Sequence, residues 1–449
     1  MSGIAAGIRL AYYDKKVCII EKHYRAGGLN SYYNLNGRIF DCGLHAITNF
    51  VPKGQKKAPL TKLLKQLKLK YEDFGLCEQK SSSINFPGVS LRFSNNLELF
   101  NQEISDKFPS QKENFQRFHK HILQFDELDL NPNSSPGLAR KVVSSFISDP
   151  LLVEMLLCPL SYYGSAKEND MDFDQFVIMF KSVFLEGFAR PEEGVKKIIN
   201  VLLKKYRECE GELRLKTGAK RINISNGKVC SVTLENGDIL ETKKILSSAG
   251  YVETMELAGE KISPDDGRIG KLSFVEIIYV LDQTPAKLGC DKSIIFYNDS
   301  EKFTYQKPDE IVDLSSGVIC CSNNFCFDSP LKDGIIRATH MANFDLWDGL
   351  KQEEYQTQKN IWQKKSLEKL LTIIPEFSPS IVFIDMFTPK TIKRFTGHFG
   401  GVVYGTPYKI KNGQTPIKNL FICGTDQGFL GITGSMLSGI SMANLHAMN

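Results

Sequence analysis

The chain has 449 residues, of which 42% are hydrophobic and 24% charged, and its formal net charge is +5. This ordinary globular composition excludes a disordered chain, and the length is sufficient for two domains or for one domain with a large insertion. The net charge is small for this length and gives no reason to expect nucleic acid as a partner.

Cysteine usage and hydropathy exclude further classes. The eleven cysteines contain no C-x-x-C pair, so we expect neither a disulfide framework nor a metal site, and a reducing compartment is the simpler interpretation. No apolar run reaches the roughly 18 residues of a membrane span. Arg9 and Asp14 interrupt the apolar N-terminal stretch, which argues against a signal peptide. We expect a cytoplasmic protein that is soluble or peripheral on a membrane.

The chain opens with a helix, a strand and a loop. Residues 2–13 have helical composition, with Ile4 and Ile8 on one stripe. Residues 17–20 (VCII) form a short apolar run that is typical of a buried parallel strand and ends at Glu21. A glycine-bearing loop follows over residues 25–31.

The middle of the chain is first mainly helical in pattern and then mixes helices with strands. Residues 53–190 have a mainly helical pattern, with breaks at 86–88 and 131–137. Residues 191–250 predict a helix at 194–209, a strand at 212–217, and hairpins at Asn226–Gly227 and Asn236–Gly237, which are strong hairpin signals. Strands such as 274–280 and a helix near 353–371 come next. The last fifty residues return to glycine-rich loops around a strand at 420–423.

The first residues match part of a dinucleotide-binding fingerprint. In G-x-G-x-x-G the glycines allow a tight turn, close approach of pyrophosphate, and packing of helix against strand. Gly3 fits the third glycine, Gly7 fits the small residue where the helix crosses the sheet, and Glu21 is placed to accept hydrogen bonds from a ribose. A buried helix followed by an ordinary strand and a surface glutamate is the alternative for these residues taken alone.

Two further segments favour a dinucleotide. Arg25, Gly27, Gly28 and Ser31 form the R-x-G-G signature of two-dinucleotide-binding-domain flavoproteins, whose backbone N–H groups can cradle phosphate. Near the C-terminus a strand ends in Gly424-x-Asp426, and a glycine-rich turn leads into a helix. This arrangement would place a carboxylate against ribitol hydroxyls and a helix N-terminus at the pyrimidine edge of a flavin. Both ends of the chain therefore predict one FAD.

The chain resembles the phytoene desaturase and retinol saturase group of FAD-dependent oxidoreductases, which are relatives of the amine oxidases. The N-terminal block, residues 191–194, 216–220 and 245–250, and the C-terminal motif recur in the family's order, with Glu193 as a departure from the usual P-x-G-G. Residues 40–45 (FDCGLH) are similar to the retinol saturase F-D-x-G-x-H stretch. Carotenoid desaturases more often have proline after that glycine, so the saturase or isomerase side is favoured.

The resemblance implies an α/β fold with two interleaved domains. Residues 1–52, 191–270 and 396–449 would form a Rossmann-like FAD-binding domain whose first strand is missing, and residues 53–190 and 271–395 an α+β substrate-binding domain. The flavin would transfer hydride to or from an allylic carbon of an apolar isoprenoid. The residues implied to bind FAD are Gly3, Gly7, Glu21, Lys22, Arg25, Gly27, Gly28, Ser31, Ala219, Gly424, Asp426, Gly434, Ser435 and Met436.

His45 is the candidate catalytic residue, as a polar group beside the flavin. The alternative is a buried, hydrogen-bonded histidine that holds a loop. No metal is expected at the site.

Two apolar stretches raise the question of a membrane. Residues 59–70 place Leu60, Leu63, Leu64 and Leu67 at helical spacing, and residues 53–70 contain seven lysines and no acid. Such a helix could lie on an anionic membrane, where a lipid-like substrate is found, or could simply expose a solvated lysine face. Residues 151–163 could line a tunnel mouth or belong to the core.

The strand and the first two glycines that normally open a dinucleotide-binding unit are absent. That strand is central and buried, and losing about five apolar residues could forfeit roughly 1.5–3 kcal/mol each. Two interpretations stay open: the natural start lies upstream, or the chain is a shortened product that binds FAD poorly or not at all. The first is favoured because everything from Gly3 onward keeps the flavoprotein pattern.

Two other functions compete with polyene chemistry. An amine oxidase-like flavoenzyme needs an aromatic cage, for which the C-terminal turn offers only Phe429. A truncated, non-catalytic form would keep the fold without FAD. Retention of Glu21, Arg25 and Asp426 together argues against it, since a protein free of FAD has no physical need for that combination.

Overall fold

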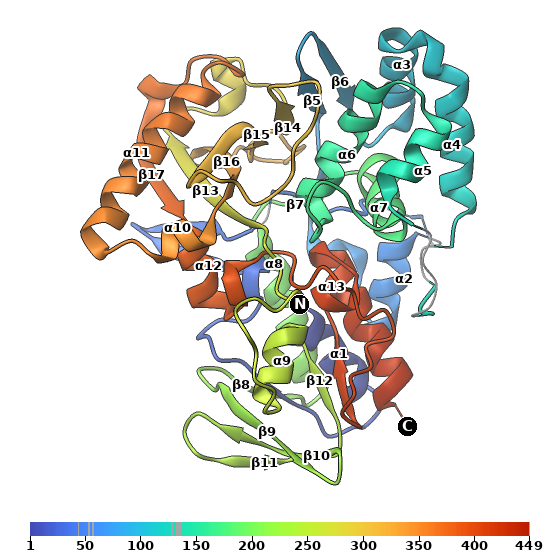
Figure 1. Cartoon of the computed structure of the whole chain (residues 1–449), viewed down its shortest axis with the longest axis vertical. Coiled ribbons are helices and arrows are strands. Elements are labelled where there is room, and N and C mark those ends of the chain that lie inside the picture. The colour runs from blue at the N-terminus through green and yellow to red at the C-terminus, as the bar shows by residue number, and fades with distance from the viewer. Residues whose placement is uncertain (44, 53, 56–57, 127–128, 132–136, 449) are drawn as a thin grey trace.

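The computed structural model describes residues 1–43, 45–52, 54–55, 58–126, 129–131 and 137–448. An upper part surrounds a large sheet, and a lower part consists of helices and short strands (Figure 1). In the lower part α1 (Ser2–Ala11) lies beside α13 (Gly431–Met442), so segments from opposite ends of the chain are neighbours. The mixed α/β architecture predicted from the sequence is confirmed.

Two parallel strand pairs in the lower part are not joined. β1 (Cys18–Ile20) pairs with β8 (Glu212–Arg214), and β12 (Ile245–Ser247) pairs with β18 (Leu420–Ile422). In a doubly wound sheet a central strand would pair with both of these pairs. None of the described strands does so. α1 packs on β1 and on α8 (Val195–Glu208).

An antiparallel meander completes the lower part. It consists of β9 (Ala219–Ser225), β10 (Lys228–Leu234) and β11 (Ile239–Glu241), and α9 (Tyr251–Leu257) packs on it. Both predicted hairpins are confirmed. In the first, Asn226 and Gly227 have φ values of 52° and 71°, the left-handed conformation that an Asn-Gly turn tolerates.

The upper part is built on a seven-stranded sheet with a separate core on each face. Along β14 (Ile294–Asn298), Ile294 and Phe296 face one core while Ile295 and Tyr297 face the other, as the two-residue period of a strand requires. In sheet order the strands are β17 (Ile381–Phe387), β13 (Ser273–Leu281), β16 (Gly334–Ala342), β15 (Val312–Cys321), β14 (Ile294–Asn298), β5 (Ser82–Phe86) and β6 (Val89–Phe93).

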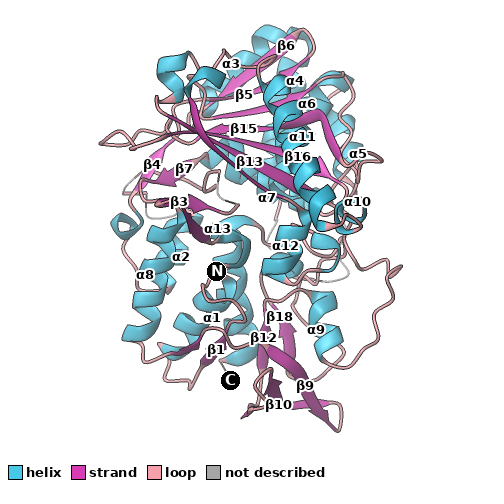
Figure 2. Cartoon of the chain, turned by 90° about the vertical axis from the view of Figure 1, so that its left-hand side faces the viewer, coloured by secondary structure: helices cyan, strands magenta, loops and turns pink. Residues whose placement is uncertain are grey.

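Helices cover both faces of this sheet, as Figure 2 shows. The first core is covered by α3 (Leu97–Lys107), α4 (Lys112–Gln124), α5 (Ala139–Phe146), α6 (Pro150–Gly164) and α7 (Phe173–Phe180). The second is covered by α10 (Phe344–Asp348) and α11 (Gln352–Leu370), and α12 (Pro389–Thr396) follows β17. The remaining elements are α2 (Pro59–Gln66), β2 (Tyr32–Leu35), β3 (Arg38–Asp41), β4 (Leu76–Glu78) and β7 (Ala189–Pro191).

The prediction that residues 53–190 are mainly helical is wrong in part. Pro87–Gly88, taken as a break between helices, is the turn of the hairpin β5–β6, which joins the large sheet. Each of these strands has five residues, which is too short for a two-residue hydrophobic period to stand out from the helical pattern around it. In addition, β5 pairs with β14, which lies far along the chain. Within the predicted break at 131–137, residues 132–136 lie outside the described part.

The leucine stripe of α2 faces the protein core. Leu60, Leu63, Leu64 and Leu67 are at most 2% exposed and pack against α1, α8 and α13. The leucine stripe is therefore not available to a membrane. The helix instead packs its leucines inside the protein and exposes its lysines to solvent. Lys53, Lys56 and Lys57 lie outside the described residues.

Residues 151–163 fall in α6, whose side chains contribute mainly to the first core. In the described ranges, no helix has both the length and the apolar composition needed to cross a bilayer. The boundaries predicted for the two domains stay a prediction.

Gly7 is a point of close approach between α1 and its neighbours. A Cβ at this position would lie 2.7 Å from Ile19 Cδ1 and 2.9 Å from the Tyr206 ring. We predict that Gly7→Val lowers the free energy of unfolding by about 1–3 kcal/mol, the usual cost of overpacking a core. Urea unfolding measures this, with Gly267→Val as control because no atom lies within 4 Å of its Cβ position. Equal stability of the two variants would contradict the packing.

Candidate functional site

Segments from three regions of the chain meet at the N-terminus of α1. A Cβ on Gly424 would lie 2.8 Å from Ser2 Oγ, and one on Gly3 would lie 3.6 Å from Ser248 Oγ. The ends of β12 and β18 therefore face the first turn of α1. This is the convergence of both chain ends that the sequence predicted.

Glu21, Lys22 and Ala219 lie around the carboxyl end of β1. Glu21 follows β1, and its Oε1 accepts a hydrogen bond of 2.9 Å from the His23 N–H. Its carbonyl accepts from the Thr217 N–H, two residues before Ala219. Lys22 forms an exposed ion pair with Glu235 at 2.7 Å.

The loop at residues 25–31 packs on α8 and is braced internally. The Arg25 guanidinium lies 4.4 Å from the centre of the Tyr32 ring and donates a hydrogen bond to the Tyr32 carbonyl. Ser31 Oγ donates to the Ala26 carbonyl. Gly27 and Gly28 have φ values of 120° and 60°, which only glycine adopts readily, so the tight path of the loop depends on them.

The C-terminal motif places its residues in different environments. Asp426 is buried, and its two oxygens accept hydrogen bonds from the N–H groups of Tyr251 and Thr406, at 2.6 and 2.9 Å. Gly434 and Ser435 lie in the first turns of α13. Met436 is fully buried in the core that α13 shares with α1 and α2, so its side chain does not face the site.

These residues suit a dinucleotide of the FAD type. The first bond of α1 runs from the Ala5 N–H to the Met1 carbonyl, so the amides before it have no partner within the helix. Neither α1 nor α13 has a side-chain cap or an acid in its first turn, which leaves both N-termini open to anionic groups. No atom lies within 4 Å of a Cβ placed on Gly28 or Gly431. The Asp426 carboxylate keeps lone pairs for a further hydroxyl.

Lys409 is a further candidate site residue that the sequence did not reveal. Its ammonium is buried 3.9 Å from Asp426 Oδ1 and donates to the Tyr404 carbonyl. Burial lowers the pKa of Lys409 to about 8, although Asp426 and Asp172 oppose the change. A buried cation beside the flavin motif can stabilise negative charge there. The residue stands in a loop without a motif, so no sequence signal distinguishes it.

His45 lies on a loop between the predicted phosphate segment and α13. The Gly43 N–H donates to the Leu29 carbonyl, and Thr433 Oγ1 of α13 donates to the Thr48 carbonyl. The described residues of this loop therefore contact both predicted halves of the cofactor site. Leu44, which belongs to the F-D-x-G-x-H stretch, lies outside the described residues.

A buried ionic cluster surrounds the His45 ring. His45 Nε2 lies 3.0 Å from Glu276 Oε1 and 3.1 Å from Thr339 Oγ1. Arg337 Nε donates to Glu276 Oε1 at 2.5 Å, and Arg337 Nη2 donates to the Cys42 carbonyl. Burial alone would raise the pKa of Glu276, but Arg337 and His45 outweigh it and lower the pKa to about 2. Glu276 is therefore ionised at neutral pH.

Sequence reasoning missed Glu276 and Arg337, although a signal was present. Each is the one residue of its strand that is Asp, Glu, Lys or Arg, and β13 is buried along its whole length. A charged residue in a fully buried strand needs a partner, which the fold supplies from the neighbouring strand and from the His45 loop.

An aromatic wall adjoins His45. The Tyr163 ring lies 6.5 Å from the His45 ring and contacts Phe188 and Phe296, at 5.1 and 5.6 Å between ring centres. The Tyr163 hydroxyl is buried and has no hydrogen-bond partner among the described residues. The surroundings of His45 thus combine an ionic side with an apolar side.

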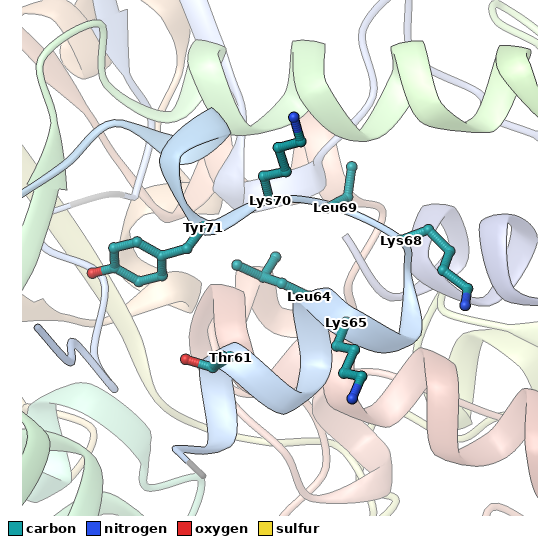
Figure 3. A pocket seen from close by; sticks show the side chains of 7 residues that line it. All are labelled: Thr61, Leu64, Lys65, Lys68, Leu69, Lys70 and Tyr71. Carbon is teal, nitrogen blue, oxygen red and sulfur yellow. The ribbon is translucent and has the colours of Figure 1, made fainter. Parts of the chain in front are cut away.

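A separate surface pocket of about 350 Å³ lies beside α2 (Figure 3). It is lined by Thr61, Leu64, Lys65, Lys68, Leu69, Lys70 and Tyr71. None of these residues belongs to the predicted cofactor set, so this pocket is not part of the site.

Comparison with known proteins identifies the family. The model of flavin-containing amine oxidoreductases matches residues 1–260, more than half of the chain. The chain belongs to this family. It is therefore a flavin-containing oxidoreductase, and the prediction of FAD as its cofactor is confirmed.

The chain is also similar to proteins named for carotenoid and retinoid reactions. The chain is 25% identical to prolycopene isomerase of Arabidopsis thaliana, over 91% of this chain and 74% of the relative. It is 20% identical to all-trans-retinol 13,14-reductase of Rattus norvegicus, over 97% and 82% of the two chains.

Solved structures share the fold. An oxidoreductase from Methanosarcina mazei has a TM-score of 0.68 at 14% identity, with 99% of this chain and 98% of that chain covered. Putrescine oxidase bound to putrescine has a TM-score of 0.61 at 15% identity, with 99% and 96% covered. The roles of individual residues, including His45, stay predictions.

The buried pair Glu276–Arg337 yields a stability prediction. Arg337→Met leaves the carboxylate buried without its cation and should cost about 3–5 kcal/mol in free energy of unfolding. The double variant Glu276→Met/Arg337→Met should recover most of this loss, because neither charge is then stranded. Urea unfolding of the wild type and both variants provides the measurement. A double variant no more stable than the single one would contradict the pairing.

The same pair predicts a pH dependence. Because the pKa of Glu276 is lowered from 4.5 to about 2 in the folded protein, its contribution to stability is complete above pH 4.5. It is lost as the pH falls toward 2. The double variant should lack this part of the acid dependence.

Proposed function

We propose that this chain is an FAD-dependent oxidoreductase that moves hydride between the flavin and an apolar polyene or isoprenoid. The observation that carries the proposal is the position of His45, whose loop contacts both predicted halves of the cofactor site and whose ring faces an aromatic wall. The relatives support the substrate class, since one is named for prolycopene and another for retinol.

Each part of the chain would have a separate task. The α1 amides and the loop at residues 25–31 would bind the pyrophosphate, and the Glu21 carboxylate would accept hydrogen bonds from the adenosine ribose. Asp426 and the N-terminus of α13 would hold the ribitol and the pyrimidine edge. The bound flavin supplies hydride transfer, and His45 is the catalytic side chain at the substrate carbon.

Glu21 gives the first test. If it binds the ribose, Glu21→Ala should weaken FAD binding about 10- to 100-fold, the value of one or two hydrogen bonds to a charged group. Flavin fluorescence titration of the purified chain measures the dissociation constant. Glu241→Ala is the matched control, because Glu241 is an exposed acid at the end of a lower-part strand. Equal affinities of the two variants would remove Glu21 from the site.

Substrate turnover distinguishes the competing functions. Bleaching of bound FAD by polyenes or retinoids under anaerobic conditions supports the proposal. Bleaching by putrescine alone would favour the amine oxidase-like alternative, a class that a structural neighbour represents. A purified chain that binds no FAD would favour the non-catalytic alternative.

We further propose peripheral contact with an anionic membrane through the end of α1 and the lysine face of α2. Lys62 and Lys65 of α2, and Lys68 in the turn that follows it, are exposed there. Tyr12 and Tyr13 are 42% and 47% exposed, and tyrosine suits the headgroup level of a bilayer. Lys68 Nζ lies 5.1 Å from the centre of the Tyr12 ring, so the basic and aromatic groups form one surface.

Vesicle binding tests this surface. Replacing Lys62, Lys65 and Lys68 by Gln should weaken binding to phosphatidylserine vesicles about 100-fold, at about 1 kcal/mol per lysine. The control replaces the exposed residues Lys351, Lys364 and Lys365 at the far end of the upper part. Equal losses in both triple variants would show a general charge effect and contradict the assignment.

A further inference from the structure

The hydrogen bonds around His45 determine which ring nitrogen carries a proton. Nε2 faces three oxygen atoms: Glu276 Oε1 at 3.0 Å, Glu276 Oε2 at 3.3 Å and Thr339 Oγ1 at 3.1 Å. Neither carboxylate oxygen has a proton to donate, because Arg337 holds Glu276 in its ionised form. The single hydroxyl proton of Thr339 is donated to Glu276 Oε2. All three oxygens can therefore only accept from the ring.

Nε2 must consequently be the donor. A neutral imidazole has one N–H and one lone pair, so a proton on Nε2 leaves the lone pair on Nδ1. Nδ1 has no hydrogen-bond partner among the described residues, and the side chain is 12% exposed, so the ring is not fully sealed. The free lone pair lies on the side of the ring away from the carboxylate.

We propose that Glu276 and Thr339 are positioning residues that hold His45 in the Nε2–H tautomer, with Nδ1 as the proton acceptor for the substrate. This inference rests on the proposed function for the identity of the substrate and deepens it by naming the proton-transfer atom. In the desaturating direction a bound oxidised flavin would accept hydride from one C–H bond, His45 Nδ1 would accept the proton of the adjacent C–H, and a C=C bond would form between the two carbons. In the saturating direction the same atoms move in reverse.

The surrounding charges suit such a proton acceptor. Glu276 and Arg337 cancel each other while His45 is neutral, and the imidazolium that forms on proton transfer gains the carboxylate as its partner. The other ionisable groups near the ring are Arg190, which donates to the His45 carbonyl and pairs with Asp41, and the neutral side chains of Cys320 and Tyr163. The backbone of His45 is thus fixed as well as its ring.

The tautomer can be measured without substrate or flavin. The chain contains seven histidines, so ¹⁵N-histidine labelling gives seven ring patterns, and His45→Gln identifies the one that belongs to His45. At a pH where the ring is neutral, we expect a protonated Nε2 and an unprotonated Nδ1. A protonated Nδ1 in the wild type would overturn the proposal.

The double variant Glu276→Met/Arg337→Met should abolish the preference for the Nε2–H form. It removes both carboxylate oxygens without stranding the arginine, so the Thr339 hydroxyl can donate to Nε2 as well as accept from it. Thr339→Val is the matched control, because it removes one acceptor but keeps the carboxylate, and the Nε2–H form should persist. An unchanged tautomer in the double variant would overturn the positioning role.

Kinetics then test the catalytic part separately. With a substrate that bleaches the flavin, Glu276→Met/Arg337→Met should lower kcat about 10²- to 10⁴-fold, the usual value of general acid–base catalysis, with little change in KM. A kcat within a few-fold of the wild type in the double variant, together with a lost preference for the Nε2–H form, would overturn proton transfer through Nδ1. If no polyene reacts with the wild type, the proposed function fails, and the nitrogen spectra alone decide the positioning role.

Discussion

The buried ion pairs at the junction of the upper and lower parts are the interactions on which the site depends. Arg337 and Glu276 project from adjacent strands of the large sheet, and Arg190 pairs with Asp41 at the end of β3. Arg337 also holds the Cys42 carbonyl, and Arg190 the His45 carbonyl. Charges buried at this depth are tolerated only when they are fully paired, so the pairs impose one conformation on the described residues of the His45 loop.

Asp41 shows how closely this junction is packed. Its Oδ1 accepts a hydrogen bond from the Val195 N–H, the first residue of α8, at 3.0 Å. A Cβ on Gly194 would lie 2.5 Å from the Asp41 carboxylate, and Gly194 has a φ of 65°. The glycine is thus required both for its conformation and for the space it leaves. The start of α8 in the lower part and the loop that carries His45 are tied to the same carboxylate.

The residues of the candidate site that belong to short sequence motifs could be predicted, and those that depend on distant partners could not. Gly3, Glu21 and the loop at residues 25–31 could be proposed from the sequence because each stands at a set distance from a strand or a helix start. Lys409, Glu276 and Arg337 were not found, since their importance comes from partners far along the chain: His45 and Glu276 are 231 positions apart. The leucine stripe of α2 was correctly placed on one helix face, but periodicity alone does not say whether that face meets lipid or protein.

The sequence by itself determined the mixed α/β class, the two Asn-Gly hairpins, the dinucleotide motifs and the flavin, because these follow from the conformational needs of glycine and asparagine and from short apolar runs. Only the tertiary structure decided that the hairpin β5–β6 joins the large sheet, that the α2 leucines pack inside, and that His45 meets Glu276 and Thr339. The reason is physical: motifs reflect local backbone geometry, whereas burial and charge pairing depend on which distant segments the folded chain brings together.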